Sequence, residues 1–317
     1  MTPSPGNGIP SSAAPVTGRI LVTGGTGYVG GNIRDALGGR PVRLLVRDMR
    51  SAGKYISKDV ELAQGDVTKA DSLRGAMDGC EAVIHLVGII EESGGATFDE
   101  VIRAGTENAV AEAKRAGVHR FVHMSAMGAQ NNDAFPYMQA KWRAEQAVKA
   151  AGIPWTIFRP SVIFGPGDGF INVLAQLVKN PLIPFIPVVG DGKSKFQPVS
   201  VYDVAAAFRK ALDEPKTAGE IYELGGPEIF TYEQLLDAIA GKVGKGRKPK
   251  VHLPLGLMKT VVKLSAPMPR ALRPPVTKEQ LTMLALDNAS SSSATPKLIG
   301  GPARSLRENM DYILNEG

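Results

Sequence analysis

Residues 19–30, RILVTGGTGYVG, decide the fold of this 317-residue chain. The apolar run 20–22 is typical of a short buried strand, and glycines follow at Gly24, Gly27 and Gly30 before a helix-compatible segment. Gly24 permits a tight turn, Gly27 lets the backbone approach a pyrophosphate, and Gly30 lets the helix pack on the strand. The first amides of the helix would then face the phosphates. The alternative is a glycine-rich turn in an unrelated α/β protein.

The segment after the second expected strand, 41–46, indicates which dinucleotide binds. Arg47 stands where a dinucleotide-binding fold contacts the adenosine ribose, about 20 residues beyond the glycine turn. An arginine there suits a 2′-phosphate, and Arg43 and Arg50 are expected to assist Arg47 in binding it. The sequence therefore predicts NADP(H). Two alternatives stay open: Arg47 is a solvated surface side chain, or the adjacent Asp48 leaves NAD(H) as the cofactor.

Strands and helices alternate from residue 19 to residue 160, which predicts an α/β fold with a doubly wound parallel (Rossmann) sheet. Ligands of such sheets bind beyond the carboxyl ends of the strands. Further strands are expected at 60–63, 82–87, 119–124 and 155–159, and helices at 28–37, 70–77, 98–117 and 136–151.

The rest of the chain is rich in glycine and proline and differs in character. We expect a smaller C-terminal α/β substrate lobe beside the dinucleotide-binding domain. Residues 197–201 are predicted as a strand, 204–212 as a helix and 288–294 as a mobile loop or linker. The expected units are a disordered tail (1–18), a Rossmann domain (19–164, to which 196–224 returns) and the substrate lobe (165–195 and 225–317).

Composition argues against several classes of protein. One cysteine, Cys80, leaves no internal disulfide and no cysteine-based metal cluster, and the four histidines show no metal-ligand spacing. The net charge of +6 is too moderate to indicate nucleic acid as a partner. No apolar run reaches the ~20 residues that a spanning helix needs, and residues 1–18 lack the pattern of a signal peptide. We therefore expect a cytoplasmic protein without a metal site.

Residues 241–264 leave two interpretations open. The segment 241–250 carries five cations and no anion, and the apolar segment 253–264 follows it. One interpretation is a peripheral contact with anionic lipid or with a lipophilic substrate such as a quinone. The other is a solvated basic loop followed by a helix packed on the lobe. The basic run lacks aromatic residues, which argues against single-stranded nucleic acid.

The expected helix 136–151 carries a residue pair that can do chemistry. Tyr137 and Lys141 are four residues apart, so they share one helix face after the fifth strand. Because a nearby ammonium favours a phenolate, Tyr137 can exchange a proton with a substrate oxygen as acid/base while hydride moves at carbon. Lys141 would also hold the nicotinamide ribose. Ser125, at the carboxyl end of the fifth strand, is the third predicted catalytic residue.

With these motifs the chain resembles the short-chain dehydrogenase/reductase superfamily, in particular its extended or atypical branch. The resemblance covers about residues 19–235. It rests on TGGTGYVG (23–30), GDV (65–67), HLVG (85–88), AGTENAV (104–110), FVHMSAMGA (121–129), YMQAK (137–141), FRPSVIFGPGD (158–168) and FQPVSVYDVAAA (196–207). The last two blocks are similar to the group that contains the NAD(P)H-binding accessory subunit of respiratory complex I and its free-standing bacterial relatives.

The resemblance implies a tightly bound dinucleotide, often NADPH, and a substrate cleft between the Rossmann domain and the C-terminal lobe. NAD(H) stays open as the alternative cofactor. The predicted cofactor-binding residues are Gly24, Thr26, Gly27, Tyr28, Val29, Gly30, Arg47, Asp66, Val67, Leu86, Val87, Gly88, Lys141, Pro160 and Val162.

Two departures from the family pattern concern the reaction. Ala126 or Met127 stands where extended members usually carry the hydroxyl that binds a substrate oxygen, and Ile102 stands where they usually carry Asn. Two functions stay open. One is an NADP-dependent oxidoreductase, or an epimerase-like enzyme, acting on an unidentified carbonyl, quinone or nucleotide-sugar-like small molecule. The other is a non-catalytic NADPH-binding redox sensor, or an assembly or accessory factor of a respiratory complex with a peripheral membrane contact. The sequence predicts no oligomeric state.

Overall fold

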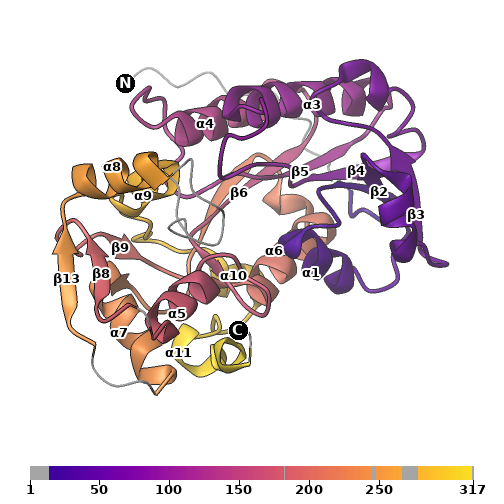
Figure 1. Cartoon of the computed structure of the whole chain (residues 1–317). Helices are drawn as coiled ribbons and strands as arrows, with labels where there is room; N and C mark the ends of the chain where they lie inside the picture. Colours follow the sequence, from indigo (N-terminus) through magenta and orange to yellow (C-terminus); the bar gives the residue numbers. More distant parts are fainter. Residues whose placement is uncertain (1–13, 182, 245–247, 266–277, 316–317) are drawn as a thin grey trace, which may run out of the picture.

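A seven-stranded parallel sheet lies at the centre of the molecule, with helices on both of its faces (Figure 1). The computed structural model describes residues 14–181, 183–244, 248–265 and 278–315. The strand order is β11-β6-β5-β4-β1-β2-β3, which confirms the predicted doubly wound α/β fold. The strands are β1 (Arg19–Thr23), β2 (Val42–Val46), β3 (Val60–Gln64), β4 (Cys80–His85), β5 (Arg120–Met124), β6 (Trp155–Pro160) and β11 (Glu220–Leu224).

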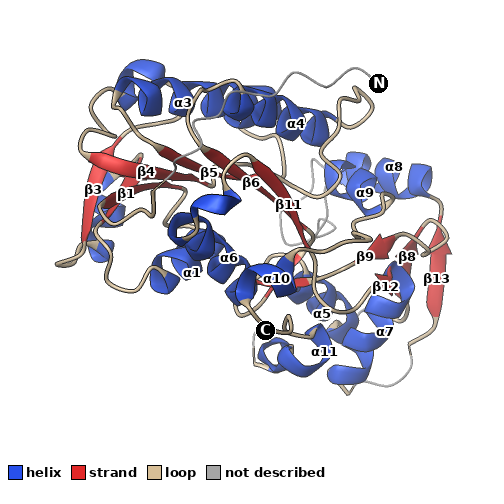
Figure 2. Cartoon of the chain, turned by 180° about the vertical axis from the view of Figure 1, so that it is seen from behind, coloured by secondary structure: helices blue, strands red, loops and turns tan. Residues whose placement is uncertain are grey.

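Two layers of helices bury the sheet (Figures 1 and 2). Side chains of β1 show why both faces are apolar: Ile20 and Val22 belong to one hydrophobic cluster, whereas Leu21 between them belongs to another. The first cluster includes residues of α1 and α6. The second includes residues of α3, of α4 and of the segment just after α4. The covering helices are α1 (Tyr28–Ala36) and α6 (Val201–Asp213) on one face, and α3 (Gly105–Arg115) and α4 (Pro136–Lys149) on the other.

Two predicted helices differ from the structure. The regular helix predicted over 70–77 is wrong: a 3₁₀ turn, η2 (Ala70–Leu73), is followed by turns, with Gly75 at φ +83°. This left-handed conformation cannot continue a helix. The helix predicted over 98–117 begins with a π-helical segment, η3 (Asp99–Ala104), and becomes α-helical only in α3.

A separate hydrophobic cluster fills the C-terminal part of the molecule. Helices α5 (Ile171–Lys179) and α7 (Tyr232–Lys242) pack against each other there and contribute most of their apolar side chains to it. The strand predicted over 197–201 is wrong in extent. Pro198 separates two short strands, β9 (Lys195–Phe196) and β10 (Val199–Ser200), and α6 begins at residue 201. Among the described residues, no helix has the length and apolar character needed to cross a membrane.

The remaining elements are short. The strands are β7 (Ile163–Phe164), β8 (Ile186–Val189), β9 (Lys195–Phe196), β10 (Val199–Ser200), β12 (Phe230–Thr231) and β13 (Lys250–Leu253). The α-helices are α2 (Met49–Ala52), α8 (Leu255–Ser265), α9 (Lys278–Leu284), α10 (Thr295–Ile299) and α11 (Leu306–Asn309). The 3₁₀ turns are η1 (Gly53–Tyr55), η4 (Pro215–Thr217) and η6 (Asp311–Leu314).

Parts of two segments that were predicted to be disordered or mobile are held by hydrogen bonds. Residues 1–13 of the predicted tail lie outside the described residues, whereas Val16 is buried and donates its amide to the carbonyl of Leu212 at 2.9 Å. The segment 288–294, predicted to be a mobile loop or linker, is hydrogen-bonded instead. Ser290 donates its amide to the side chain of Gln197. The Ser293 hydroxyl donates to the carbonyl of Gly225 and accepts the amide of Gly225.

Candidate functional site

The glycine turn joins β1 to α1 at the carboxyl edge of the sheet. Gly24 has φ +71°, a conformation that glycine adopts without strain. A Cβ at Gly30 would overlap the carbonyl oxygen of Gly24 and lie 2.6 Å from the Cα of Gly25, so the close approach of helix and turn requires glycine. Thr26 and Gly27 are exposed within the turn. Gly27 is the N-cap of α1, and no side chain in the described part of the chain caps this helix. A helix N-terminus presents backbone amides and a positive dipole end, which suit an anion.

Tyr28 and Val29 occupy the first turn of α1 and are half-buried. The Tyr28 hydroxyl lies against the loop after β7, because a Cβ at Gly165 would be 2.7 Å from it. The same loop contains Asp168, whose Oδ2 accepts the Tyr312 hydroxyl at 2.5 Å. Tyr28 at the start of α1 and Tyr312 in the C-terminal part of the described chain thus contact the same loop.

The residues after β2 lie where the adenosine ribose is predicted. Arg47 and Arg50 are exposed. The Asp48 carboxylate caps α2 by accepting the Arg50 amide at 2.9 Å, and this hydrogen bond lowers the pKa of Asp48. Arg43 does not join this group, because it stands near the opposite end of β2 and binds Glu61 and the carbonyls of residues 76 and 78.

The residues after β3 are fixed by local hydrogen bonds. Asp66 Oδ1 accepts the backbone amide of Thr68 at 3.0 Å and its hydroxyl at 2.9 Å. Val67 is buried, and its carbonyl accepts the side-chain amide of Asn108 on α3 at 2.8 Å. This segment therefore has a defined position at the same edge as the glycine turn.

The segment after β4 packs directly on the glycine turn. The position of a Cβ at Gly24 is 3.4 Å from Leu86 and from the amide nitrogen of Val87. Below them, His85 bonds to the hydroxyls of Thr23 at 2.9 Å and Thr106 at 3.1 Å. Burial lowers the pKa of His85 to about 3, so its ring is neutral and serves this buried network. Sequence patterns did not single out either threonine.

Lys141 and Gly88 meet at the ends of β4 and β5. Lys141 is 3% exposed, and its Nζ donates to the carbonyl of Met124 at 2.9 Å. A Cβ at Gly88 would lie 3.2 Å from this Nζ and 4.0 Å from Ile102. Burial is the main cause that lowers the pKa of Lys141 from 10.5 to about 8. At neutral pH the side chain therefore still carries its charge.

Tyr137 lies one helical turn before Lys141 on α4. Its ring packs edge-on against Phe98, with the centroids 5.5 Å apart, and is half-buried. Burial raises the pKa of Tyr137 to about 12, so the side chain is a neutral phenol at physiological pH. It is thus prepared to donate a proton rather than to accept one.

Ser125 belongs to a buried network at the ends of β5 and β6. Its hydroxyl donates to Glu145 Oε1 at 2.5 Å, and Glu145 also accepts two hydrogen bonds from Arg159, at 2.7 Å and 2.6 Å. Ser125 is 3% exposed. Its hydroxyl proton is therefore directed at α4, and the catalytic role of Ser125 stays a prediction. The neighbouring Met127 is buried and donates its amide to Pro160.

Pro160 and Val162, at the end of β6, are held from the C-terminal part of the chain. The side-chain oxygen of Asn288 accepts the Val162 amide at 2.9 Å and the Ser161 hydroxyl at 2.5 Å. Sequence reasoning missed Asn288, since nothing in the run NASSSSA indicates a partner more than a hundred residues away.

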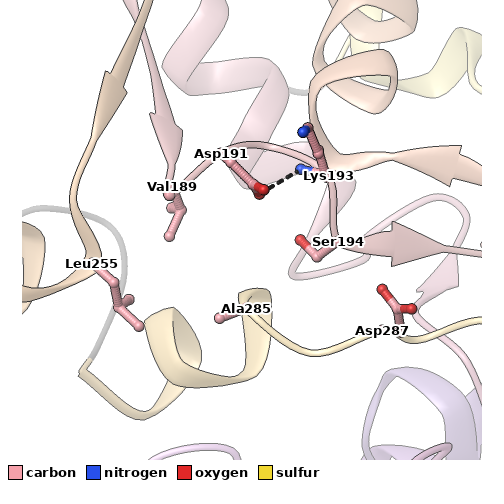
Figure 3. A pocket seen from close by; sticks show the side chains of 8 residues that line it. Val189, Asp191, Lys193, Ser194, Leu255, Ala285 and Asp287 are labelled. Atoms are coloured by element: carbon pink, nitrogen blue, oxygen red, sulfur yellow. Dashed lines mark hydrogen bonds between the residues drawn. The ribbon is translucent and has the colours of Figure 1, made fainter.

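The predicted residues follow β1 to β6, and these strands end at one edge of the sheet because all of them are parallel. A cavity of about 270 Å³ lies elsewhere, in the C-terminal part (Figure 3). The apolar side chains of Val189, Leu255 and Ala285 and the carboxylates of Asp191 and Asp287 line it. It contains none of the predicted site residues and is smaller than the roughly 300–1,000 Å³ of ordinary ligand sites.

A family model described as NAD(P)H-binding matches residues 24–215. NADH dehydrogenase (ubiquinone) 1 alpha subcomplex subunit 9, mitochondrial, of Arabidopsis thaliana is 32% identical over 241 residues, which are 73% of this chain and 59% of that protein. The chain thus spans little more than half the length of that relative.

One further relative and one solved structure match over nearly their full length. The NAD(P)H azoreductase of Xenophilus azovorans is 27% identical over 299 residues, which are 91% of this chain and 96% of that protein. The triphenylmethane reductase of Citrobacter sp., solved in complex with NADP(H), superposes with a TM-score of 0.72 at 20% identity, covering 94% of this chain and 100% of that one. The latter similarity shows a shared fold.

Proposed function

The chain belongs to the NAD(P)H-binding family and is related to the extended short-chain dehydrogenases/reductases, and we propose that it is an NADP(H)-dependent oxidoreductase. Its substrate would be a carbonyl, quinone or nucleotide-sugar-like small molecule. One observation supports this most: Lys141 is buried at the ends of β4 and β5, one helical turn from the half-buried phenol of Tyr137.

The dinucleotide fits the residues at the carboxyl edge of the sheet. The uncapped N-terminus of α1 and the exposed Gly27 suit a pyrophosphate, which needs amide donors and close backbone approach. Arg47 and Arg50 would bind a 2′-phosphate, and Asp48 is already used as a helix cap. Lys141 would donate to the nicotinamide ribose. The remaining predicted contacts lie at or just after the carboxyl ends of β3, β4 and β6: Asp66, Val67, Leu86, Val87, Gly88, Pro160 and Val162.

Bound NADPH would supply a hydride to the substrate carbon. Tyr137 would give its phenolic proton to the substrate oxygen, and the raised pKa of Tyr137 keeps this proton in place until then. The ammonium of Lys141 would stabilise the phenolate that results. Phe98, against which Tyr137 packs, would exclude water from this region. Ser125 would take part in substrate binding only after its hydroxyl leaves Glu145.

The assignment of Tyr137 is tested by replacing it with phenylalanine. We expect Tyr137→Phe to lower kcat for a carbonyl or quinone substrate about 10²–10⁴-fold, the usual contribution of a general acid. NADPH affinity should not change. Tyr202→Phe, at an exposed tyrosine on α6, is the matched control and should retain full turnover. Equal turnover of Tyr137→Phe and the wild type would contradict the assignment.

The cofactor preference is tested by isothermal titration with NADPH and NADH. We expect NADPH to bind more tightly, and Arg47→Ala to reduce the preference at least about tenfold, since a charge-assisted hydrogen bond contributes about 1.5–3 kcal/mol. The exposed Arg74→Ala serves as control, because this residue lies outside the predicted site. A wild type that binds both dinucleotides equally would overturn the role of Arg47.

A second proposal is a non-catalytic NADPH-binding sensor or accessory factor. It is supported by the use of the Ser125 hydroxyl within the protein and by the Arabidopsis relative, which is named as a subunit of an NADH dehydrogenase. In addition, α8 exposes Leu257, Val261 and Leu264 on one side of the helix, where they could contact a partner or a membrane surface. Of the basic run 241–250, residues 245–247 lie outside the described residues.

Two measurements separate the proposals. Tight NADPH binding without turnover on a broad panel of carbonyls and quinones would favour the accessory role. Sedimentation with anionic vesicles at low salt tests the peripheral contact, which Leu257→Glu should weaken if α8 takes part. Retention of vesicle binding by this variant would exclude α8 from the contact.

A further inference from the structure

We propose that Glu145 is a positioning residue of the candidate site: its carboxylate, fixed by Arg159 and Ser125, keeps Lys141 charged and in place at the cofactor edge. The inference rests on the proposed function, since Lys141 marks the predicted nicotinamide end. No sequence motif described above assigns a role to Glu145.

The carboxylate of Glu145 is buried and fully engaged. It is 0% exposed, stands one helical turn after Lys141 on α4, and accepts three hydrogen bonds from other elements. Ser125 donates one from the end of β5, and Arg159 donates two from β6. A buried carboxylate persists only when it is paired and hydrogen-bonded in this way.

The surroundings of Lys141 explain why a nearby negative charge matters. The Ile102 side chain approaches the same space at Gly88, so an apolar group stands next to the buried ammonium. Burial alone favours the neutral amine and lowers the pKa of Lys141, whereas the charge of Glu145 raises it. Glu145 thus opposes the loss of the proton that burial promotes.

The titratable groups near the carboxyl ends of β4 and β5, beneath Lys141, carry no compensating negative charge. His85 on β4 and His123 on β5 are buried, and burial lowers the pKa of both, so they are neutral at physiological pH. Tyr137 is a neutral phenol. Arg159 on β6 is positive and would by itself disfavour a charged lysine, but it is paired with Glu145.

Three acidic groups on the helices packed around α4 have partners of their own. Asp99 on η3 and Glu107 on α3 both pair with Arg103, at 2.6 Å each. Glu112, near the end of α3, pairs with Arg115 at 2.7 Å. The further charges on these helices, exposed or half-buried, are Glu100, Lys114, Arg143 and Lys149. Glu145 is therefore the acidic group placed to act on Lys141 among the described residues.

The network also fixes geometry. The amide of Ser125 donates to the carbonyl of Phe158 on β6 at 2.7 Å. Lys141 donates to the carbonyl of Met124, the residue before Ser125. Through Glu145, helix α4 is joined to the ends of both β5 and β6. The turn of α4 that carries Lys141 is thus held from two strands.

The pH dependence of NADPH affinity tests the proposal in a way that a purely structural role would not affect. Affinity of the wild type should fall as Lys141 loses its proton, with a midpoint near its pKa of about 8. Glu145→Gln removes a negative charge and should move the midpoint about one pH unit lower. Arg159→Gln removes a positive charge and should move it higher. Glu112→Gln, at another buried glutamate paired with arginine, is the matched control and should leave it unchanged.

A second measurement does not need the cofactor. The side-chain ¹⁵N signal of Lys141, identified by its absence in Lys141→Met, can be titrated in the cofactor-free protein. If NADPH does not bind at all, the proposed function fails while this titration still reports on Glu145. The charge-retaining Glu145→Asp should keep the wild-type midpoint. If Glu145→Gln does not fold, Arg159→Gln, which should move the midpoint higher, takes its place. A midpoint unmoved in Glu145→Gln, or shifted in the same direction in Arg159→Gln, overturns the proposal.

Discussion

Two adjacent glycines of α1 provide a matched test of how closely the helix must approach the glycine turn. At Gly30 a new Cβ would meet backbone atoms of Gly24 and Gly25, which cannot rotate away. At Gly31 the nearest atom is the end of the Arg34 side chain at 4.0 Å. Replacing glycine with alanine inside a helix stabilises it by about 0.5–1 kcal/mol where there is room. Overpacking costs about 1–3 kcal/mol or more.

Gly31→Ala should therefore raise the free energy of unfolding by about 0.5–1 kcal/mol, whereas Gly30→Ala should lower it by about 1–2 kcal/mol after the helix gain is subtracted. Urea denaturation measures both values. Because the clash displaces α1 from the turn, Gly30→Ala should also weaken NADPH binding at least about tenfold, while Gly31→Ala binds normally. Equal stability and equal affinity of the two variants would refute the close approach at Gly30.

Two further predictions concern buried polar groups. Lys141→Met should stabilise the protein at neutral pH: a pKa lowered from 10.5 to about 8 corresponds to about 3 kcal/mol, an upper limit because the bond to Met124 is lost. Between about pH 8 and pH 10.5 the unfolded chain binds more protons than the folded chain, so the stability of the wild type rises with pH. The stability advantage of Lys141→Met, measured by urea denaturation, should therefore shrink over this range. An advantage that stays constant would contradict the lowered pKa of Lys141. Tyr312→Phe should lower the free energy of unfolding by about 2 kcal/mol, because the hydrogen bond that the Tyr312 hydroxyl donates to the Asp168 carboxylate is lost. It should also weaken NADPH binding, since the loop of Asp168 contacts Tyr28; an unchanged denaturation curve would show that the bond is not formed in solution.

Local patterns in the sequence predicted the central sheet well. Strand residues and the spacing of Gly24, Gly27 and Gly30 are encoded within a few positions, so the order of strand, turn and helix could be derived from them. The same reasoning failed at 70–77, where helix-compatible residues precede the left-handed Gly75. Propensity alone did not indicate that the chain turns there.

Contacts between distant residues were beyond sequence reasoning. No sequence pattern singled out Glu145, because its partner Ser125 follows β5 and its partner Arg159 lies on β6. Asn288 was assigned to a mobile segment, although its side chain binds the end of β6. Such pairs depend on where the fold brings the elements, which a single sequence does not reveal.

The position of β11 at the edge of the sheet has a consequence for biosynthesis. β6 is complete once residue 160 has been made, but β11, which pairs with it, ends only at residue 224. During this interval a growing chain presents an uncovered parallel strand, a site where chains associate wrongly. Asn288 and Tyr312 leave the ribosome later still. The glycine turn is thus translated long before Asn288 and Tyr312, so dinucleotide capture would mark a chain that has been synthesised beyond residue 312.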